Sequence, residues 1–221
     1  MLEICNIHKI YSKGTAQEKR VLRGASYCFQ DGTFYTIIGK SGCGKTTLLH
    51  ILGGLDAPDQ GNVLLDGMDV LSHSRRRRAV LRRRKIGFVF QSYNLLQEHT
   101  ALENIVMPFV LDRSRIDQKR LDVVCSTLGI EEMLHKYPMQ LSGGEQQRIA
   151  IARAIVHNPS VVLADEPTGN LDPQTAGATV SLLKRVVTQF GTTLVLVTHD
   201  MEIVAGSQKI LQIEDGKIVE E

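Results

Sequence analysis

The sequence predicts an α/β fold built on a mainly parallel sheet, and two patterns support that prediction. The first is a set of apolar runs, at 86–90, 161–164 and 194–198, which are typical of strands buried on both faces. The second is a set of helical segments, which follow Gly44, Ser142, Asp172 and His199. Strands and helices that alternate along a chain indicate an α/β core.

The composition is typical of a folded globular protein. Of the 221 residues 43% are apolar and 23% are charged, and the net charge is +2. A chain of this length can form one large domain or two small ones. So small a net charge gives no overall field that would favour nucleic acid or an anionic membrane. The four cysteines lack the spacing of a zinc site or a disulfide framework, which indicates a reducing compartment such as the cytosol.

The start of the chain is rich in strand patterns, which occupy 2–7, 21–29, 33–38 and 62–65. The turn of Gln30, Asp31 and Gly32 predicts a hairpin between the second and third of these strands. The middle of the chain, about 92–157, lacks convincing strands and is predicted to be mostly helical. We therefore expect a single domain over residues 1–221, in which the β-rich start and the helical middle are subdomains.

A glycine-rich loop follows the third strand. Its residues are Gly39, Lys40, Ser41, Gly42, Cys43, Gly44, Lys45 and Thr46, and they match the pattern GxxxxGK(S/T) in full. A preceding strand and a following helix are the context that this pattern requires for phosphate binding. The glycines let backbone N–H groups surround the phosphates, Lys45 can reach the β- and γ-phosphates, and the Thr46 hydroxyl can bind Mg²⁺. Residues 39–47, which include Thr47, are therefore predicted to bind ATP with Mg²⁺.

Cys43 lies inside this loop and leaves two interpretations open. A reactive thiol there would make ATP binding sensitive to oxidation or alkylation. The interpretation that we favour is a small residue whose backbone N–H matters and whose side chain does not, because the sequence supplies no resolving cysteine.

Polar residues follow the apolar strands at the edge where α/β sheets bind ligands. One strand is followed by Asp165, which can hold Mg²⁺, and by Glu166, our candidate for polarising an attacking water. The other two are followed by His199 and Gln91. Further on, Asp172 precedes a proline, and this pair predicts the N-terminus of a helix.

A second helix start carries a different motif. Ser142 is followed three residues later by Glu145, which predicts a capping box. Gly143 and Gly144 lie beside the cap and leave backbone N–H groups bare, and bare donors at a helix start form an anion site. A second phosphate site in a chain that already has one suggests that ATP is held between two copies of the protein.

These motifs, in this order, resemble those of the ATP-binding cassette (ABC) ATPases, and the resemblance covers essentially the whole chain. It implies a P-loop NTPase core with an N-terminal antiparallel β subdomain and an inserted helical subdomain. It also implies that Gln91 contacts Mg²⁺ and water and links to a membrane partner, and that His199 contacts the γ-phosphate. Tyr11 matches the aromatic residue that stacks on adenine, although a tyrosine after an N-terminal strand often only packs.

The resemblance further implies a head-to-tail homodimer with two ATP sites. Ser142 and Gly144 of one copy would close on the γ-phosphate held by Lys45 of the other. Asp172 would touch the opposite subunit's site, a role that is compatible with capping its own helix.

Finer strings, at 86–91, 101–105 and 167–172, look like the lipoprotein-release, macrolide-export and antimicrobial-peptide-resistance ATPases and a related cell-division ATPase. That class implies a Mg²⁺-dependent ATPase at the cytoplasmic face of the membrane, where ATP-driven dimer closure powers a separate permease. An alternative stays open, in which the ATP cycle recruits or controls a membrane partner without moving a substrate.

Two basic clusters, at 75–78 and 82–85, precede the strand that ends at Gln91. The interpretation that we favour is a solvated helix face. A surface that faces the membrane or the permease is the second interpretation. Nucleic acid is the third, and we do not expect it as a partner.

Overall fold

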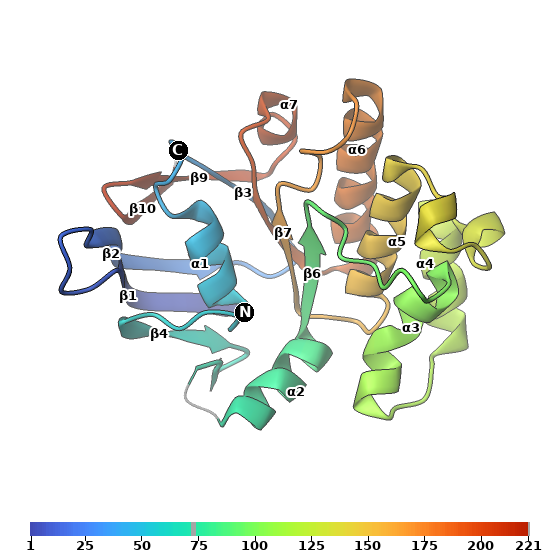
Figure 1. Cartoon of the computed structure of the whole chain (residues 1–221), viewed down its shortest axis with the longest axis horizontal. Helices are drawn as coiled ribbons and strands as arrows, with labels where there is room; N and C mark the ends of the chain where they lie inside the picture. The colour runs from blue at the N-terminus through green and yellow to red at the C-terminus, as the bar shows by residue number, and fades with distance from the viewer. Residues whose placement is uncertain (72–73, 221) are drawn as a thin grey trace.

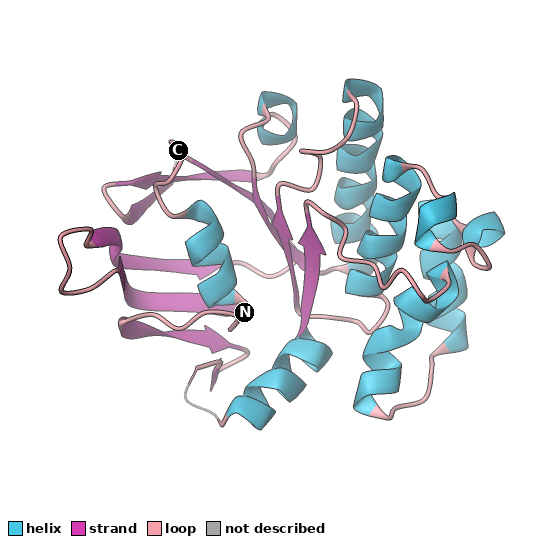
Figure 2. Cartoon of the chain, viewed as in Figure 1, coloured by secondary structure: helices cyan, strands magenta, loops and turns pink. Residues whose placement is uncertain are grey.

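The computed structural model describes residues 1–71 and 74–220, which form two sheets with helices around them (Figure 1). The strands lie mostly on one side of the molecule and the helices mostly on the other (Figure 2). The six strands of the larger sheet are, in spatial order, β10 (Lys217–Glu220), β9 (Lys209–Glu214), β3 (Phe34–Ile38), β8 (Thr193–Val197), β7 (Val161–Asp165) and β6 (Ile86–Phe90). All neighbours pair in parallel except β10, which is antiparallel to β9.

The register of the parallel strands brings four strand ends into one row. Ile37 lies opposite Val197, Val197 opposite Asp165, and Asp165 opposite Phe90. Since the strands all run the same way, the residues that follow this row share one edge of the sheet. The loop after β3 and the polar residues after β6, β7 and β8 are therefore held close together.

Both faces of the larger sheet are buried, and the side chains alternate between two cores. In β7, Val161 and Leu163 pack into one core, whereas Val162 and Ala164 pack into the other. The first core also contains α1 (Lys45–Leu52) and residues of the smaller sheet. The second contains the long helices of the middle and C-terminal parts of the chain. Burial on both faces explains why these strands are uninterrupted apolar runs.

The smaller sheet is antiparallel and four-stranded. Its strands are, in spatial order, β2 (Lys19–Phe29), β1 (Leu2–Tyr11), β4 (Gln60–Leu65) and β5 (Met68–Asp69). In Figure 1, α1 runs between this sheet and the larger one. The start of α1 therefore faces the junction of the two sheets.

The remaining helices are α2 (Arg75–Lys85), α3 (Ala101–Asp112), α4 (Gln118–Leu128), α5 (Gly143–Ile155), α6 (Pro173–Phe190) and α7 (Met201–Val204), with short 3₁₀ turns at Glu131–Met133 and Pro138–Gln140. Residues 92–157 contain helices and no strand, as the pattern predicts. None of the helices within residues 1–71 and 74–220 has both the length and the apolar character needed to cross a bilayer.

One sequence prediction is wrong. The turn at Gln30–Gly32 does not form a hairpin, because β2 pairs with β1 whereas β3 pairs with β8 and β9. The turn instead carries the chain from one sheet to the other. Only Gly32 of this turn has a positive φ, 66°, whereas a type I′ hairpin turn requires two such residues in succession.

Two hairpins that the sequence analysis did not predict are present, and both follow that rule. They connect β4 to β5 through Asp66 and Gly67, and β9 to β10 through Asp215 and Gly216. In each pair the aspartate and the glycine both have positive φ, 52° and 77° in the first and 47° and 77° in the second.

Asn104 ties the loop after β6 to α3, and its substitution tests the importance of that loop. Its side chain is fully buried, accepts from the Leu96 N–H at 2.8 Å, and donates to the carbonyls of Leu96, His99 and Thr100. We expect Asn104→Ala to lower the free energy of unfolding by about 2 to 3 kcal/mol, because buried backbone groups lose their partner. Urea denaturation followed by circular dichroism measures this loss. Gln17→Ala, at an exposed loop position, should change stability little, and equal losses in the two variants would contradict the argument.

Candidate functional site

The glycine-rich loop after β3 is shaped by close contacts at its glycines. Gly44 precedes α1 with a φ of 113°, and a Cβ at this position would lie 2.5 Å from a methyl group of Val21. Only glycine fits both the conformation and the space. The first N–H groups of α1 are thus held at the mouth of the loop, where a helix N-terminus attracts anions.

The side chain of Lys45 lies over this loop. Its ammonium group donates to the Gly39 carbonyl at 2.8 Å and to the Lys40 carbonyl at 3.2 Å. The positive charge is therefore concentrated beside the helix N-terminus. A phosphate group placed there would meet both the lysine and the backbone N–H groups.

Thr46 and Asp165 meet between α1 and β7. The Thr46 hydroxyl donates to Oδ1 of Asp165 at 3.1 Å. Burial raises the pKa of Asp165, and the hydroxyl together with the nearby Lys45 acts in the opposite direction. A partly buried carboxylate beside a hydroxyl is a hard oxygen pair of the kind that Mg²⁺ binds, usually with one or two carboxylates and the phosphates of a nucleotide. No group of three or more His, Cys, Asp or Glu suited to a metal ion occurs among the described residues.

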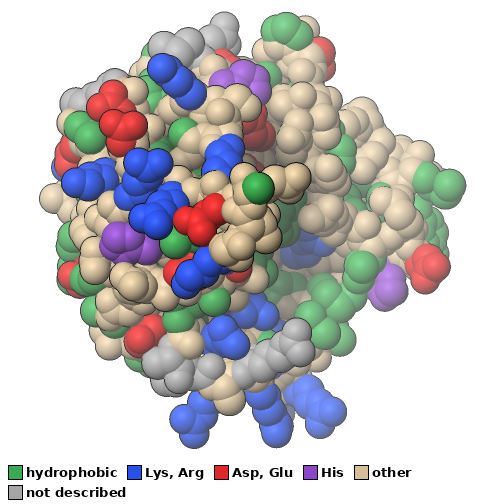
Figure 3. All heavy atoms as spheres, turned by 60° about the vertical axis from the view of Figure 1, so that its left-hand side comes forward, with side chains coloured by type: hydrophobic (Ala, Val, Ile, Leu, Met, Phe, Trp, Pro, Cys, Tyr) green, Lys and Arg blue, Asp and Glu red, His purple; other side chains and the backbone are tan. Residues whose placement is uncertain are grey.

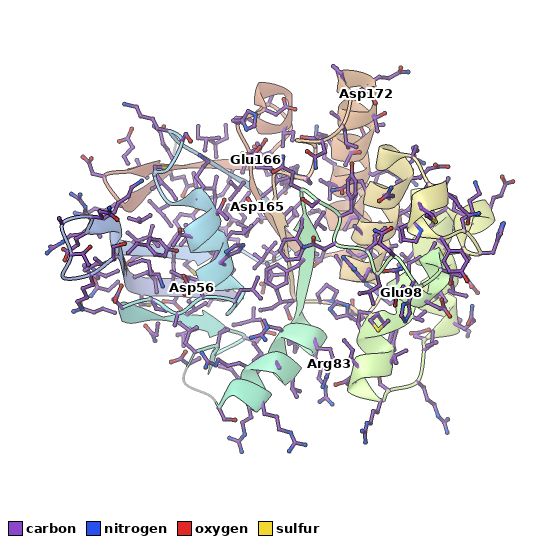
Figure 4. All side chains as sticks on the ribbon, in the orientation of Figure 1. Asp56, Arg83, Glu98, Asp165, Glu166 and Asp172 are labelled. Atoms are coloured by element: carbon purple, nitrogen blue, oxygen red, sulfur yellow. The ribbon has the colours of Figure 1, made fainter. Side chains whose placement is uncertain are left out.

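Glu166 and His199 form the second pair at this edge. Nδ1 of His199 lies 2.6 Å from Oε2 of Glu166. Glu166 has a φ of 46°, in the left-handed region, and its N–H donates to the Val197 carbonyl at 2.9 Å. Asp165 and Glu166 are labelled next to each other near the end of β7 in Figure 4. The histidine side chain is 77% exposed and the glutamate side chain only 21%, so the pair faces solvent from the histidine side.

Tyr11 lies beside Thr47, in the first turn of α1. Its hydroxyl is 3.2 Å from the Thr47 hydroxyl and donates to Asp56 at 3.3 Å. The ring is 41% exposed, and the ammonium of Lys9 lies 5.2 Å from its centre. The ring is thus positioned by polar contacts at its edge and leaves apolar surface open to a flat ligand.

A cavity of about 530 Å³ joins these groups, except for Asp165, which is absent from its lining. Its lining contains ten residues that the sequence predicts, namely Tyr11, Gly39, Ser41, Gly42, Gly44, Lys45, Thr46, Thr47, Glu166 and His199. It also contains Lys19 and Val21 of β2, which the sequence analysis missed. A Cβ on Gly42 would lie 3.2 Å from the Lys19 ammonium, so this second lysine lies directly beside the loop. No motif spacing marks Lys19, because pairing of β2 with β1 in the other sheet brings it there.

Other predicted residues lie outside the cavity lining. Lys40 and Cys43 line an adjoining hollow of about 480 Å³ together with the β9–β10 turn. Gln91 contacts the segment after Glu166: its amide donates to Asn170 at 3.3 Å, and the Asn170 amide donates to the Gln91 carbonyl at 3.0 Å. Among the hydrogen bonds of the described residues, none joins Gln91 to Thr46 or Asp165.

The second helix start forms a separate cluster. Ser142 caps α5, and its N–H and hydroxyl are both bonded to Glu145, so the predicted capping box is confirmed. A Cβ on Gly144 would lie 2.5 Å from Cγ2 of Thr175, in the first turn of α6. Asp172 caps α6 by accepting from the Thr175 N–H at 3.1 Å, which confirms that predicted helix start.

This cluster takes no part in the cavity beside Lys45. Ser142, Gly143, Gly144 and Asp172 are absent from its lining. A Cβ on Gly143 would lie 2.9 Å from the Tyr93 hydroxyl, so both glycines are packed closely against neighbouring segments. Within one copy, the N-termini of α1 and α5 therefore do not share one cavity.

Comparison with known proteins agrees with these features. Residues 22–169 match the family model described as ABC transporter. The lipoprotein-releasing system ATP-binding protein LolD of Bordetella pertussis is 43% identical, over 98% of this chain and 94% of LolD. The macrolide export ATP-binding/permease protein MacB of Syntrophobacter fumaroxidans is also 43% identical, over 99% of this chain but only 31% of MacB.

A solved structure also matches this chain over its whole length. It is the ATP-binding cassette MJ0796 in a dimeric, post-hydrolysis state bound to ADP and Pi, with a TM-score of 0.88 and 37% identity over 100% of this chain and 98% of that one. The match confirms the predicted fold class, a mixed α/β cassette with a parallel core and an antiparallel N-terminal sheet. The chain belongs to the ABC transporter family, of which it is an ATP-binding cassette.

Proposed function

We propose that this protein is a Mg²⁺-dependent ATPase that works as a homodimer and powers a separate membrane permease. The observation that carries the proposal is the set of contacts at one sheet edge, where the pairs Thr46–Asp165 and Glu166–His199 lie beside Lys45. A second helix start with bare donors lies outside that cavity. The whole of residues 1–221 would act as one ATPase domain with a helical subdomain at about 92–157.

Each group has a role that fits its position. Backbone N–H groups of residues 39–47 and the Lys45 ammonium would bind the phosphates, and Tyr11 would stack on the adenine. Thr46 and Asp165, with Gln91, would hold Mg²⁺, which neutralises phosphate charge when bound. Glu166 would accept a proton from the attacking water, and its contact with His199 supports placing that histidine near the γ-phosphate.

The dimer follows from the separation of the two helix starts. Ser142, Gly143, Gly144 and Asp172 of one copy would close on the nucleotide held by the other. The dimeric state of the MJ0796 cassette, bound to ADP and Pi, supports this arrangement. Closure would exclude water, and the chemistry would then depend mainly on positioning and electrostatic stabilisation.

An apolar groove supports a permease partner. It has a volume of about 590 Å³ and lies between α2, β6, α3 and α5. Leu55, Leu96 and Leu111 line it, and each is more than two-fifths exposed. The strand β6 forms one wall and leads directly to Gln91, so an occupant of the groove would lie next to the segment that contacts Asn170. Such a partner would hold the protein at the cytoplasmic face of the membrane.

Lys45→Ala should weaken ATP binding by about 10- to 100-fold, because a charge-assisted hydrogen bond contributes about 1.5 to 3 kcal/mol. Equilibrium binding of a fluorescent ATP analogue measures the effect. Lys40→Ala is the matched control, since this lysine belongs to the same loop but its side chain lines the adjoining hollow. Unchanged affinity in the Lys45 variant would remove the lysine from the proposed site.

Glu166→Gln should keep ATP binding and lower hydrolysis by about 10²- to 10⁴-fold, because the amide cannot accept the proton of the attacking water. Phosphate release gives the rate, and light scattering after size-exclusion chromatography with ATP gives the mass. We expect the variant to accumulate as a dimer. Glu131→Gln, an exposed acid in the helical middle, should behave like the wild type. Full turnover by the Glu166 variant would overturn its catalytic role.

Tagged Glu166→Gln protein, purified with ATP from detergent-solubilised native membranes, should carry a stoichiometric permease. Leu96→Asp in the groove should abolish that capture, because a charge would be buried against an apolar partner. Leu102→Asp, at an exposed position outside the groove lining, should not. Recovery of soluble partners alone would favour the alternative, in which the ATP cycle controls a membrane partner without transport.

A further inference from the structure

Helix α2 carries its charges where folding alone does not favour them. Ser74 caps the helix, and Arg76 and Arg77 lie in its first turn, with no acidic residue in that turn. The side chain of Arg75 lies outside the described part of the structure. The N-terminus of a helix bears partial positive charge, so cations there are unfavourable. Such a local conflict in a native sequence is expected at a functional surface.

The C-terminal half of α2 is anchored to the body of the protein. Arg83 and Arg84 both reach the carboxylate of Asp112 at the end of α3, at 3.1 and 2.9 Å. Lys85 pairs with Asp66 at 3.2 Å. The labelled Arg83 lies between α2 and the end of α3 in Figure 4. These contacts hold the helix firmly and neutralise part of its charge.

Arg76 and Arg77, in the N-terminal half, have no such partners among the described residues. Within residues 1–71 and 74–220, neither Arg76 nor Arg77 forms an ion pair, and both are exposed. Arg77 lies two helical turns before Arg84, and Arg76 lies two turns before Arg83. The two free cations therefore lie on the same faces of α2 as the two arginines that pair with Asp112. In Figure 3, Lys and Arg side chains project from the lower edge of the molecule, where α2 lies in Figure 1.

Exposed apolar side chains lie at the end of α3, which Arg83 and Arg84 contact. Val110 and Leu111, the two residues before Asp112, are 59% and 58% exposed, and Arg113 after it is exposed as well. We call the surface of Arg76, Arg77, Arg84, Val110, Leu111 and Arg113 the basic edge. It joins four arginines, of which Arg84 is paired with Asp112, to two solvent-exposed aliphatic side chains.

We propose that the basic edge binds the surface of a membrane that contains anionic phospholipids. Arginines attract the headgroups, and aliphatic side chains beside them enter the boundary of the acyl region, which is the combination found in interfacial segments. A nucleic-acid surface would gain nothing from Val110 and Leu111, and the basic edge has no aromatic side chain on which a base could stack.

The position of the basic edge suits this partner. Because α2 precedes β6, it lies at the amino end of the parallel strands, whereas the Thr46–Asp165 pair lies at the carboxyl end. Leu111 and Arg83 also line the groove assigned above to the permease. Lipid contact would orient the cassette beside its permease, yet it needs neither ATP nor that partner.

Flotation of the purified wild-type protein with vesicles tests the proposal. Vesicles of phosphatidylcholine with about one-third phosphatidylserine should bind the protein, and vesicles of phosphatidylcholine alone should not. Arg76→Gln/Arg77→Gln should weaken binding by about 25-fold, since each basic side chain near an anionic surface contributes about fivefold. Val110→Ser/Leu111→Ser should weaken it by at least about fourfold, the factor for one CH₂ group withdrawn from the acyl boundary.

The matched control is Lys13→Gln/Lys217→Gln, which removes the same charge from two exposed positions in other parts of the chain. It should bind like the wild type, and both this control and the Arg76/Arg77 variant should keep the wild-type ATPase rate. The proposal would be overturned if the wild type did not bind anionic vesicles, or if the control lost as much vesicle binding as the Arg76/Arg77 variant. It would also be overturned if a short nucleic-acid duplex displaced the protein from vesicles at a phosphate concentration below that of the vesicle lipid. If the Val110/Leu111 variant bound vesicles as well as the wild type, the two aliphatic side chains would not enter the membrane. The basic edge would then attract phosphate groups in general, which would contradict the proposal.

Discussion

The parallel pairing of β3, β8, β7 and β6 is the constraint on which the rest of the structure depends. Its register puts Ile37, Val197, Asp165 and Phe90 in one row. The glycine-rich loop after β3 and the residues that follow the other three strands are therefore brought together by the strand pairing alone. A slip of one residue in any pair would invert which side chains enter each core, as the alternation along β7 shows. Burial on both faces therefore fixes the geometry of the sheet edge.

The residues at that edge are not optimised for stability alone. Burial raises the pKa of Asp165, which means that its ionised form is costly in the folded protein, and the Thr46 hydroxyl offsets only part of the cost. Glu166 adopts a left-handed conformation that is uncommon for a residue with a side chain. Both features are expected where a carboxylate is retained for a cation or for proton transfer, because either role needs a charge that the fold by itself disfavours.

Local rules predicted much of this structure. The strands of the parallel core are long apolar runs, and the caps at Ser142 and Asp172 depend on residues close in sequence, so both were predictable. The hairpin expected at Gln30–Gly32 was wrong because Tyr35 and its neighbours in β3 are buried on both faces and require a central place in the larger sheet. The Asp-Gly pairs at 66–67 and 215–216 carried the true hairpin signal. Lys19 and the bond from Gln91 to Asn170 arise from tertiary packing, which no spacing in the chain encodes.

The bond between Gln91 and Asn170 also links the end of β6 to the segment between Glu166 and the second helix start. Asn170 lies between Glu166 and Asp172, and Asp172 caps the helix whose Thr175 packs against Gly144. Gln91 in turn follows the strand that forms a wall of the apolar groove. A chain of contacts between the groove and the second helix start does not by itself couple the two sites. Coupling requires an element that has two arrangements and whose equilibrium both sites can shift. Residues 92–157 are the segment best suited to that role, because they begin right after Gln91 and end with the helix that carries Ser142. A rotation of that segment about its two attachments would move the α3 and α5 walls of the groove together with the second helix start, while β6 and the sheet edge that holds Lys45, Asp165 and Glu166 stay fixed by the register.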